Sequence, residues 1–329
     1  MMEKQQQADI KKKTSIGGQA LIEGIMMRGP EKSAMAVRHV SGEIILETWE
    51  NPQSHLPAFT RWPFVRGIFN FVDSLRIGYK ALMRSAEICG LEDEEPEPVD
   101  ESLTEEERAA AAEKKKKKES ALMNALMVVS SILGVGLAIV LFMWLPIQIF
   151  GWLTKLAPSL DHRYLRGIFE GVLRIAIFLV YMFAVSRMKD IRRTFQYHGA
   201  EHKTIFCYEK GLELTVENVR PQQRFHPRCG TSFLILMLLV GIIISILIPI
   251  TNTWLRTAVK LLLIPLTVGI GYELIKLAGR KDNLFTRIIS KPGMWMQRLT
   301  TIEPDDSMIE CAIAALKEVI PEDPEADRW

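Results

Sequence analysis

The chain has 329 residues, of which 48% are hydrophobic and 24% are charged, and its formal net charge is +2. This apolar content excludes a disordered chain, and four cysteines are too few for a disulfide-stabilised scaffold. The small net charge gives no reason to expect nucleic acid as a partner. The mean hydropathy of +0.09 is high for a soluble protein with so many charges. This average conceals that the apolar residues are concentrated in the second half of the chain, with the charges between the apolar blocks.

The N-terminal tail, residues 1–13, is polar and ends in three lysines. It contains neither the apolar run nor the small-residue cleavage site of a signal peptide. We therefore expect the N-terminus to remain in the cytoplasm, where the four widely spaced cysteines are reduced.

A small soluble α+β unit is expected over residues 14–91. Gly17 and Gly18 indicate a tight turn near its start. Two strand-like segments follow, at 33–40 and 44–49, and the Ser-Gly pair between them predicts a β-hairpin.

An amphipathic helix is predicted over residues 59–89, at the end of this unit. Its apolar residues recur at helical spacing, and its polar face is mostly basic. This pattern is typical of a helix that lies on an anionic membrane surface, and a soluble helix packed on the strands explains it equally well. The charged run at 92–119 is expected to be a flexible linker without a chemical role.

Four apolar segments follow the linker, at 124–150, 168–186, 232–250 and 255–278. Each is long enough to cross a bilayer as a helix, which takes about 20 residues. The expected fold is therefore a mainly α-helical integral membrane protein, with about four transmembrane helices and a small N-terminal α+β cytoplasmic unit. The second half of the chain then divides into helices 1 and 2 (120–186), a motif loop (187–230), helices 3 and 4 (231–278) and a C-terminal tail (279–329).

The distribution of basic residues predicts the orientation, because loops rich in lysine and arginine remain in the cytoplasm. Such residues are concentrated before the first apolar segment, in the motif loop and after the fourth segment. The short loops at 151–166 and 251–256 carry fewer of them. Both termini and the motif loop are therefore expected on the cytoplasmic side.

Charged side chains inside the apolar segments are candidate functional groups. Glu170 and Arg174 lie four residues apart, so they share a helix face and could pair. Glu273 could pair with Lys260, with Arg174 or with a residue of the C-terminal tail. Because it lies near the end of its segment, it could also extend to the membrane surface.

The densest chemistry lies in the motif loop, where His198, Glu201 and His202 form the pattern His-x-x-Glu-His. Helical residues that are four positions apart differ by about 40° in direction, so the two histidines could bind one metal ion. The spacing is that of the inverted zinc-hydrolase motif, in which the glutamate is the general base. Gly199 argues against a regular helix at this point.

A catalytic zinc site needs a third protein ligand. The turn before the third apolar segment offers His226 and Cys229, which have the His-x-x-Cys spacing of a metal-binding turn. Cys207 is a poorer candidate, because on a continuous helix it projects about 140° away from His202.

A purely structural interpretation of this region is also open. The polar side chains would then satisfy hydrogen bonds where two helices reach the membrane surface, and Lys203, Arg224 and Arg228 would bind lipid phosphates. Near the N-terminus, Glu23 is expected to be a surface charge unless the segment around it folds over the histidine motif.

Three motifs carry a family resemblance: Gly17 to Arg28 (GGQALIEGIMMR), Tyr197 to Lys203 (YHGAEHK) and Arg224 to Ser232 (RFHPRCGTS). Together with the tail around Pro292-Gly293, they resemble the YqhQ-like family of bacterial multi-pass membrane proteins of unknown function. The resemblance covers nearly the whole chain except the linker. It implies a protein of the bacterial inner membrane, in a family commonly described as candidate metal-dependent enzymes.

The first functional hypothesis is a metal-dependent hydrolase, with zinc as the metal, at the cytoplasmic face of the membrane. The two histidines of the motif would bind the metal with Cys229 or His226 as third ligand, and Glu201 would activate water. The second hypothesis is a non-enzymatic scaffold or small transporter that binds a partner or a lipid headgroup. In both, the expected partner is the lipid bilayer with its anionic headgroups, and the sequence indicates no protein partner.

Overall fold

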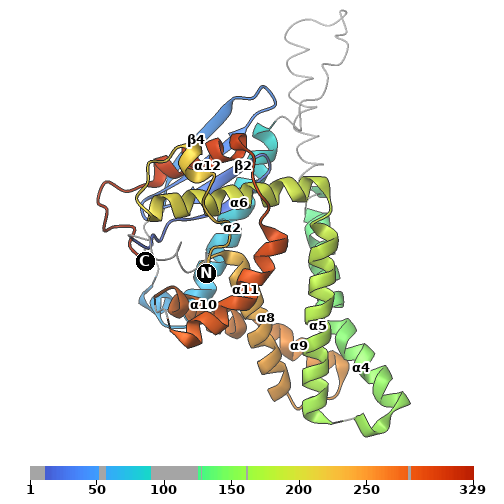
Figure 1. The fold of residues 1–329 in the computed structure, drawn as a ribbon. Coiled ribbons are helices and arrows are strands. Elements are labelled where there is room, and N and C mark those ends of the chain that lie inside the picture. The colour runs from blue at the N-terminus through green and yellow to red at the C-terminus, as the bar shows by residue number, and fades with distance from the viewer. Residues whose placement is uncertain (1–11, 52–56, 90–124, 127, 161, 281–282) are drawn as a thin grey trace, which may run out of the picture.

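The computed structural model describes residues 12–51, 57–89, 125–126, 128–160, 162–280 and 283–329. The linker expected at 92–119 and nearly all of the polar tail at 1–13 lie outside the described residues. The described chain is mainly helical, with one small antiparallel sheet near the N-terminus (Figure 1).

The sheet is a four-stranded antiparallel meander in the order β1-β2-β3-β4. Its strands are β1 (Gly17–Leu21), β2 (Gly24–Arg28), β3 (Lys32–Arg38) and β4 (Ile44–Glu50). The predicted hairpin is confirmed as β3 and β4, and Gly42 takes a φ of 90° in the turn between them, a conformation that suits glycine.

The prediction of a turn at the two N-terminal glycines is wrong, because Gly17 and Gly18 lie inside β1. The chain reverses four residues later, where Leu21 pairs with Gly24 across two residues. Glu23 occupies the second turn position with a φ of 48°. Gly18 serves close packing, since a Cβ atom there would lie 2.7 Å from the Met26 carbonyl oxygen.

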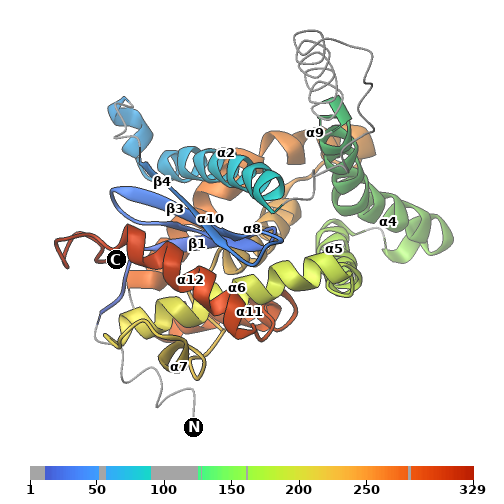
Figure 2. The same ribbon diagram turned by 90° about the horizontal axis from the view of Figure 1, so that it is seen from above.

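Both faces of the sheet are buried, so the side chains of β2 and β3 alternate between two cores. Ile25 and Met27 pack with α6 (Lys189–Glu209) and α12 (Asp306–Val319). Met26 and Met35 pack with α2 (Val65–Ile88) on the opposite face. Figure 2 shows the resulting three layers, with α2 on one side of the sheet and α6 and α12 on the other.

The amphipathic helix predicted at 59–89 is present as η1 (Ala58–Arg61) and α2. Its C-terminal half packs on the sheet, as in the soluble alternative, and its N-terminal half packs on α10 (Ile264–Arg280). Gly67 permits this second contact, because a Cβ atom there would lie 2.6 Å from the Cβ atom of Tyr272.

Three helices are long and apolar enough to cross a membrane: Val128–Leu156, Tyr164–Val185 and Gly230–Leu247. A fourth candidate is the bent pair of α9 (Thr253–Leu262) and α10. Figure 1 shows the helices α4, α5, α8 and α9 extending away from the sheet. Their bounds are η2 (Val140–Trp144) and α4 (Leu145–Leu156) within the first span, α5 (Arg163–Val185) and α8 (Gly230–Leu247).

The fourth apolar segment is bent by 46°, where a single straight span was expected. Pro265 is the second residue of α10, directly after the break. A proline cannot donate a backbone hydrogen bond, and its ring does not fit inside a straight helix. The remaining short elements are η3 (Pro158–Leu160) and α7 (Val216–Val219), and α11 (Leu284–Thr300) follows α10.

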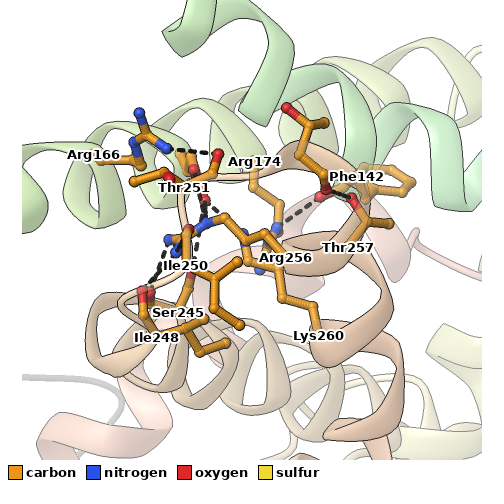
Figure 3. A network of polar contacts seen from close by, with 12 residues as sticks. Phe142, Arg166, Arg174, Ser245, Ile248, Ile250, Thr251, Arg256, Thr257 and Lys260 are labelled. Carbon is orange, nitrogen blue, oxygen red and sulfur yellow. Dashed lines mark hydrogen bonds and ion pairs between the residues drawn. The ribbon is translucent and has the colours of Figure 1, made fainter. Parts of the chain in front are cut away.

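A buried polar cluster joins three of the apolar helices (Figure 3). The Glu170 carboxylate accepts hydrogen bonds from Arg256 Nε at 3.1 Å and Lys260 Nζ at 2.5 Å. Arg174 donates instead to the Phe142 carbonyl at 2.7 Å, within the π-helical turn η2. The pairing expected between Glu170 and Arg174 is therefore replaced by bonds to neighbouring helices.

Arg256 also stabilises the C-terminal end of α8. Figure 3 shows its guanidinium among the last carbonyl groups of that helix, and it donates to Ser245, Ile248 and Ile250 at 2.6–3.1 Å. The carbonyls of Ile248 and Ile250 lie beyond the end of α8, and the buried cation satisfies them together with that of Ser245. The cluster thus ties α5, α8 and α9 together within the apolar bundle.

Candidate functional site

Helix α6 places the histidine motif under the sheet. His198, Glu201 and His202 are separated by three and four residues, so they share one face of the helix. Contrary to expectation, the helix is regular through Gly199. The glycine is needed for packing, since a Cβ atom there would overlap the Ile302 carbonyl oxygen of the neighbouring chain segment.

Each histidine ring is oriented by a hydrogen bond to a backbone carbonyl. His198 Nδ1 donates to the Thr300 carbonyl at 2.7 Å, and His202 Nδ1 donates to the Arg224 carbonyl at 2.5 Å. These bonds use the two Nδ1 atoms, so the two Nε2 atoms remain as the possible ligand atoms of the rings. Metal-binding histidines are commonly held in this way, with the second ring nitrogen bonded to a carbonyl or carboxylate.

Cys229 completes a group of three donor atoms. Its Sγ lies 3.1 Å from His198 Nε2, and the ligand atoms of His198, His202 and Cys229 all lie within 4.8 Å of one another. Cys229 is also the N-cap of α8, where its sulfur accepts the Thr231 backbone N–H. His202 is buried, with 1% of its surface exposed, and its Nε2 has no hydrogen-bond partner among the described residues.

The charges in this group stabilise one another. Burial disfavours charge on both side chains, but the sulfur of Cys229 raises the pKa of His198 to about 9. The two histidines in turn hold the pKa of the Cys229 thiol well below its usual range. The cysteine therefore takes the thiolate form, which is the form that binds metals.

Glu201 lies beside the group and is 5% exposed. Burial raises the pKa of its carboxyl group, against the opposing effect of the two histidines. The Gly18 backbone N–H donates to Glu201 Oε1 at 3.0 Å, and a Cβ atom on Gly18 would lie 3.0 Å from Glu201 Cδ. Gly18 belongs to the first motif of the family resemblance, but its contact with Glu201 was not predicted, because the two residues are 183 positions apart.

His226 lies next to this group but outside it. Its ring centroid is 5.5 Å from that of His202, and its Nε2 lies 3.7 Å from a Glu209 carboxylate oxygen. Burial lowers the pKa of His226 to about 4, so the ring is neutral. Gln297 lies in the tail segment that carries part of the family resemblance, although no role was predicted for it. Its buried side chain accepts from the His226 backbone N–H and donates to its carbonyl, both at 2.7 Å.

Comparison with known proteins identifies the family of this chain. A family model described as "Protein of unknown function (DUF1385)" matches residues 62–322. The chain belongs to the DUF1385 family. It is also 34% identical over 308 residues to the uncharacterized protein YqhQ of Bacillus subtilis (strain 168), which covers 92% of each chain. No solved structure matches the chain.

The comparison confirms the resemblance to YqhQ-like proteins, and the DUF1385 family carries no assigned function. The matched region contains α6, the turn with Cys229, α8 and α11, so the whole donor group lies within it. It begins after β1–β4, and the Gly18 contact to Glu201 therefore comes from outside the matched region.

The other candidate residues of this DUF1385 protein form ion pairs elsewhere. Glu23 binds Arg193 through two contacts of 2.5 Å. Glu273 binds Arg66, with Nε at 2.7 Å, and so has neither Lys260 nor Arg174 as its partner. The N-terminal segment does reach the motif on α6: the Gly18 backbone N–H binds Glu201, and the Glu23 side chain accepts a hydrogen bond from the Tyr197 hydroxyl at 3.3 Å.

The cations suggested for lipid phosphates also have protein partners. Lys203 and Arg224 both bind Glu303, and Arg228 binds Glu209. Lys203 is only 4% exposed. Because these charges are already compensated by carboxylates, they are poorly suited to capture a further anion.

Proposed function

We propose that the chain is a metal-dependent membrane enzyme that uses zinc for hydrolysis. The observation that carries this proposal is the convergence of His198, His202 and Cys229 around the unpartnered His202 Nε2. Two imidazoles and a thiolate are donors that zinc prefers. The carbonyl partners of both Nδ1 atoms supply the expected outer contacts.

The number of ligands supports a catalytic rather than a structural site. Structural zinc sites use four protein ligands, whereas catalytic sites use three and keep one position open. The described residues offer three. Zinc in such a site acts as a Lewis acid and lowers the pKa of water to about 7.

Glu201 is the proposed general base. Its carboxylate lies near the two histidines and is oriented by the Gly18 N–H. Burial raises its pKa, which brings the carboxyl group closer to the range where it can accept a proton and return it near neutral pH. Gly18 is a positioning residue in this scheme, because its N–H holds one carboxylate oxygen.

The proposed location is the cytoplasmic surface of the bacterial inner membrane. Cys229 immediately precedes α8, one of the apolar helices, so the donor group lies at the end of a candidate span. The basic residues in the motif loop support a cytoplasmic position for that end.

Metal analysis of the purified full-length chain, prepared without chelator, tests this proposal. We expect about one zinc per chain by plasma mass spectrometry and at least a tenfold loss in the double variant His198→Ala/His202→Ala. The matched control is His39→Ala/His162→Ala, which removes two histidines outside the group and should retain the metal. Absence of stoichiometric metal from the unmutated chain would contradict the proposal.

A scaffold or small transporter is the second candidate, and the Glu170 cluster is the observation that favours it. Arg174 is buried, with 7% of its surface exposed, and in the part of the chain that the structure describes its Nη2 atom has no hydrogen-bond partner. Intramembrane charges commonly mark transport paths. We place this candidate second, because Arg256 and Lys260 are already bound to Glu170 and connect the helices.

A further inference from the structure

A half-open groove of about 600 Å³ lies along one side of α11. The turn that precedes α8 contributes Phe225 to its lining. The residues that line it are Phe225, Lys291, Pro292, Met294, Trp295 and Arg298.

The groove shares this turn with the proposed metal site. Phe225 stands between Arg224, whose carbonyl orients the His202 ring, and His226, whose backbone is fixed by Gln297. The end of α11 reaches the site as well, because the Thr300 carbonyl binds His198. A molecule in the groove would therefore lie next to segments that position two of the three donor residues.

The groove combines apolar walls with two available cations. Lys291 and Arg298 are seven residues apart on α11, which places them on the same helix face two turns apart. Within the part of the chain that the structure describes, neither side chain has an ion pair or a hydrogen bond. This distinguishes them from Lys203, Arg224 and Arg228, which are all bound to carboxylates.

The position of α11 places the groove at the expected membrane surface. The helix packs on α8 and α10, and Gly293 allows a close crossing, since a Cβ atom there would lie 2.5 Å from Ser232 Cβ. Trp295 is 74% exposed and Leu284 is 76% exposed. Phe285 and Ile288, near the start of α11, are also exposed. Exposed tryptophan together with lysine and arginine is typical of helices at a bilayer surface.

We propose that this groove binds an anionic phospholipid of the surrounding bilayer. The headgroup phosphate would lie between Lys291 and Arg298, and part of the acyl chains would lie against Phe225, Met294 and Trp295. The charges match, because the groove carries two cations and no carboxylate. That this lipid is also the substrate class of the enzyme rests on the proposed function, whereas the binding itself does not.

Tryptophan quenching by brominated lipids tests the lipid selectivity of the groove. The full chain is reconstituted in phosphatidylcholine with increasing fractions of either phosphatidylglycerol or phosphatidylcholine that carries bromine on its acyl chains. The difference between the unmutated chain and Trp295→Phe isolates the fluorescence of Trp295. We expect half-maximal quenching at an about tenfold lower fraction of brominated phosphatidylglycerol than of brominated phosphatidylcholine.

The double variant Lys291→Gln/Arg298→Gln should abolish this preference, so that half-maximal quenching occurs at about the same fraction of both lipids. The matched control is Arg280→Gln, which removes an exposed cation at the end of α10, outside the groove, and should keep the preference. Thermal unfolding measured on the same samples shows that each variant is folded. Equal quenching by both lipids, or an unchanged preference in the double variant, overturns the proposal.

Two further arms separate the possible outcomes. If inorganic phosphate at millimolar concentration abolishes the preference, the groove binds soluble phosphate and the lipid proposal is wrong. Zinc content is measured on the same preparations. Lipid preference without zinc overturns the proposed function alone, whereas zinc without lipid preference overturns the groove proposal alone.

Discussion

At the scale of single residues, the question for the donor group is whether its third ligand is a cysteine or a histidine. Cys229 and His226 are three residues apart in the same turn, and both were candidates for the third ligand. Cys229 lies 3.1 Å from His198 Nε2, whereas His226 faces Glu209. The helix N-terminus and two histidines favour the Cys229 thiolate, and burial keeps His226 neutral.

The first prediction separates these two residues. Cys229→Ala should lower bound zinc by at least tenfold, because it removes one of three donors. His226→Ala should retain metal close to one per chain, since its side chain is outside the donor group. Metal content of the two variants, measured side by side, checks this. The opposite result, with His226→Ala losing the metal, would make His226 the third ligand.

At the scale of elements, glycines determine how closely the segments of the site approach. Gly18 brings β1 against Glu201, Gly199 brings α6 against residue 302, and Gly293 brings α11 against α8. A glycine in the middle of a helix costs about 1 kcal/mol in helix propensity relative to alanine. Gly199 and Gly293 therefore lower the stability of their helices locally, but they allow the contacts that hold the donor group and the groove in place.

The second prediction concerns Gly199→Ala. Helix propensity alone would stabilise the variant by about 1 kcal/mol. The added Cβ would overlap the Ile302 carbonyl, and such overpacking costs about 1–3 kcal/mol. We therefore expect the free energy of unfolding to fall by up to about 2 kcal/mol, measured by thermal unfolding of the full chain with circular dichroism.

The control for this prediction is Gly151→Ala in α4, where a Cβ atom would have no neighbour within 4 Å. This variant should be as stable as the unmutated chain or more stable. Stabilisation by Gly199→Ala to the same extent would show that the close contact with Ile302 does not constrain α6.

At the scale of the whole molecule, the sheet, α6, α11 and α12 gather at one end of the apolar helices (Figure 1). The connections α4–α5 and α8–α9 meet away from the sheet, where Arg166 donates to the Thr251 carbonyl at 3.1 Å. This arrangement is compatible with the orientation expected from the basic residues, in which both short connections face outward.

The third prediction tests this orientation by cysteine labelling. The four native cysteines are buried, so they provide a low background. Ser159→Cys, in the exposed η3 connection, should react with a membrane-impermeant maleimide in intact cells. Ser41→Cys, at the exposed β3–β4 turn, should react only after permeabilisation. Labelling of Ser41→Cys in intact cells would show that the sheet faces outward.

Patterns that repeat along the chain were predictable. The β3–β4 hairpin, the amphipathic α2 and the apolar helices follow from hydrophobic periodicity, which depends only on neighbouring residues. The shared face of His198 and His202 follows from helical spacing in the same way. Partners of charged residues were not predictable, because Glu170–Lys260 and Glu273–Arg66 join positions 90 and 207 residues apart.

The sequence by itself determined the mainly helical class, the apolar helices and the histidine spacing, because each depends on local periodicity. Only the tertiary structure decided that Cys229 joins the two histidines, and that the Gly18 backbone reaches Glu201. The physical reason is that side-chain convergence depends on how distant segments cross. Those crossings are determined by contacts such as Gly199 against Ile302, which no local pattern in the chain encodes.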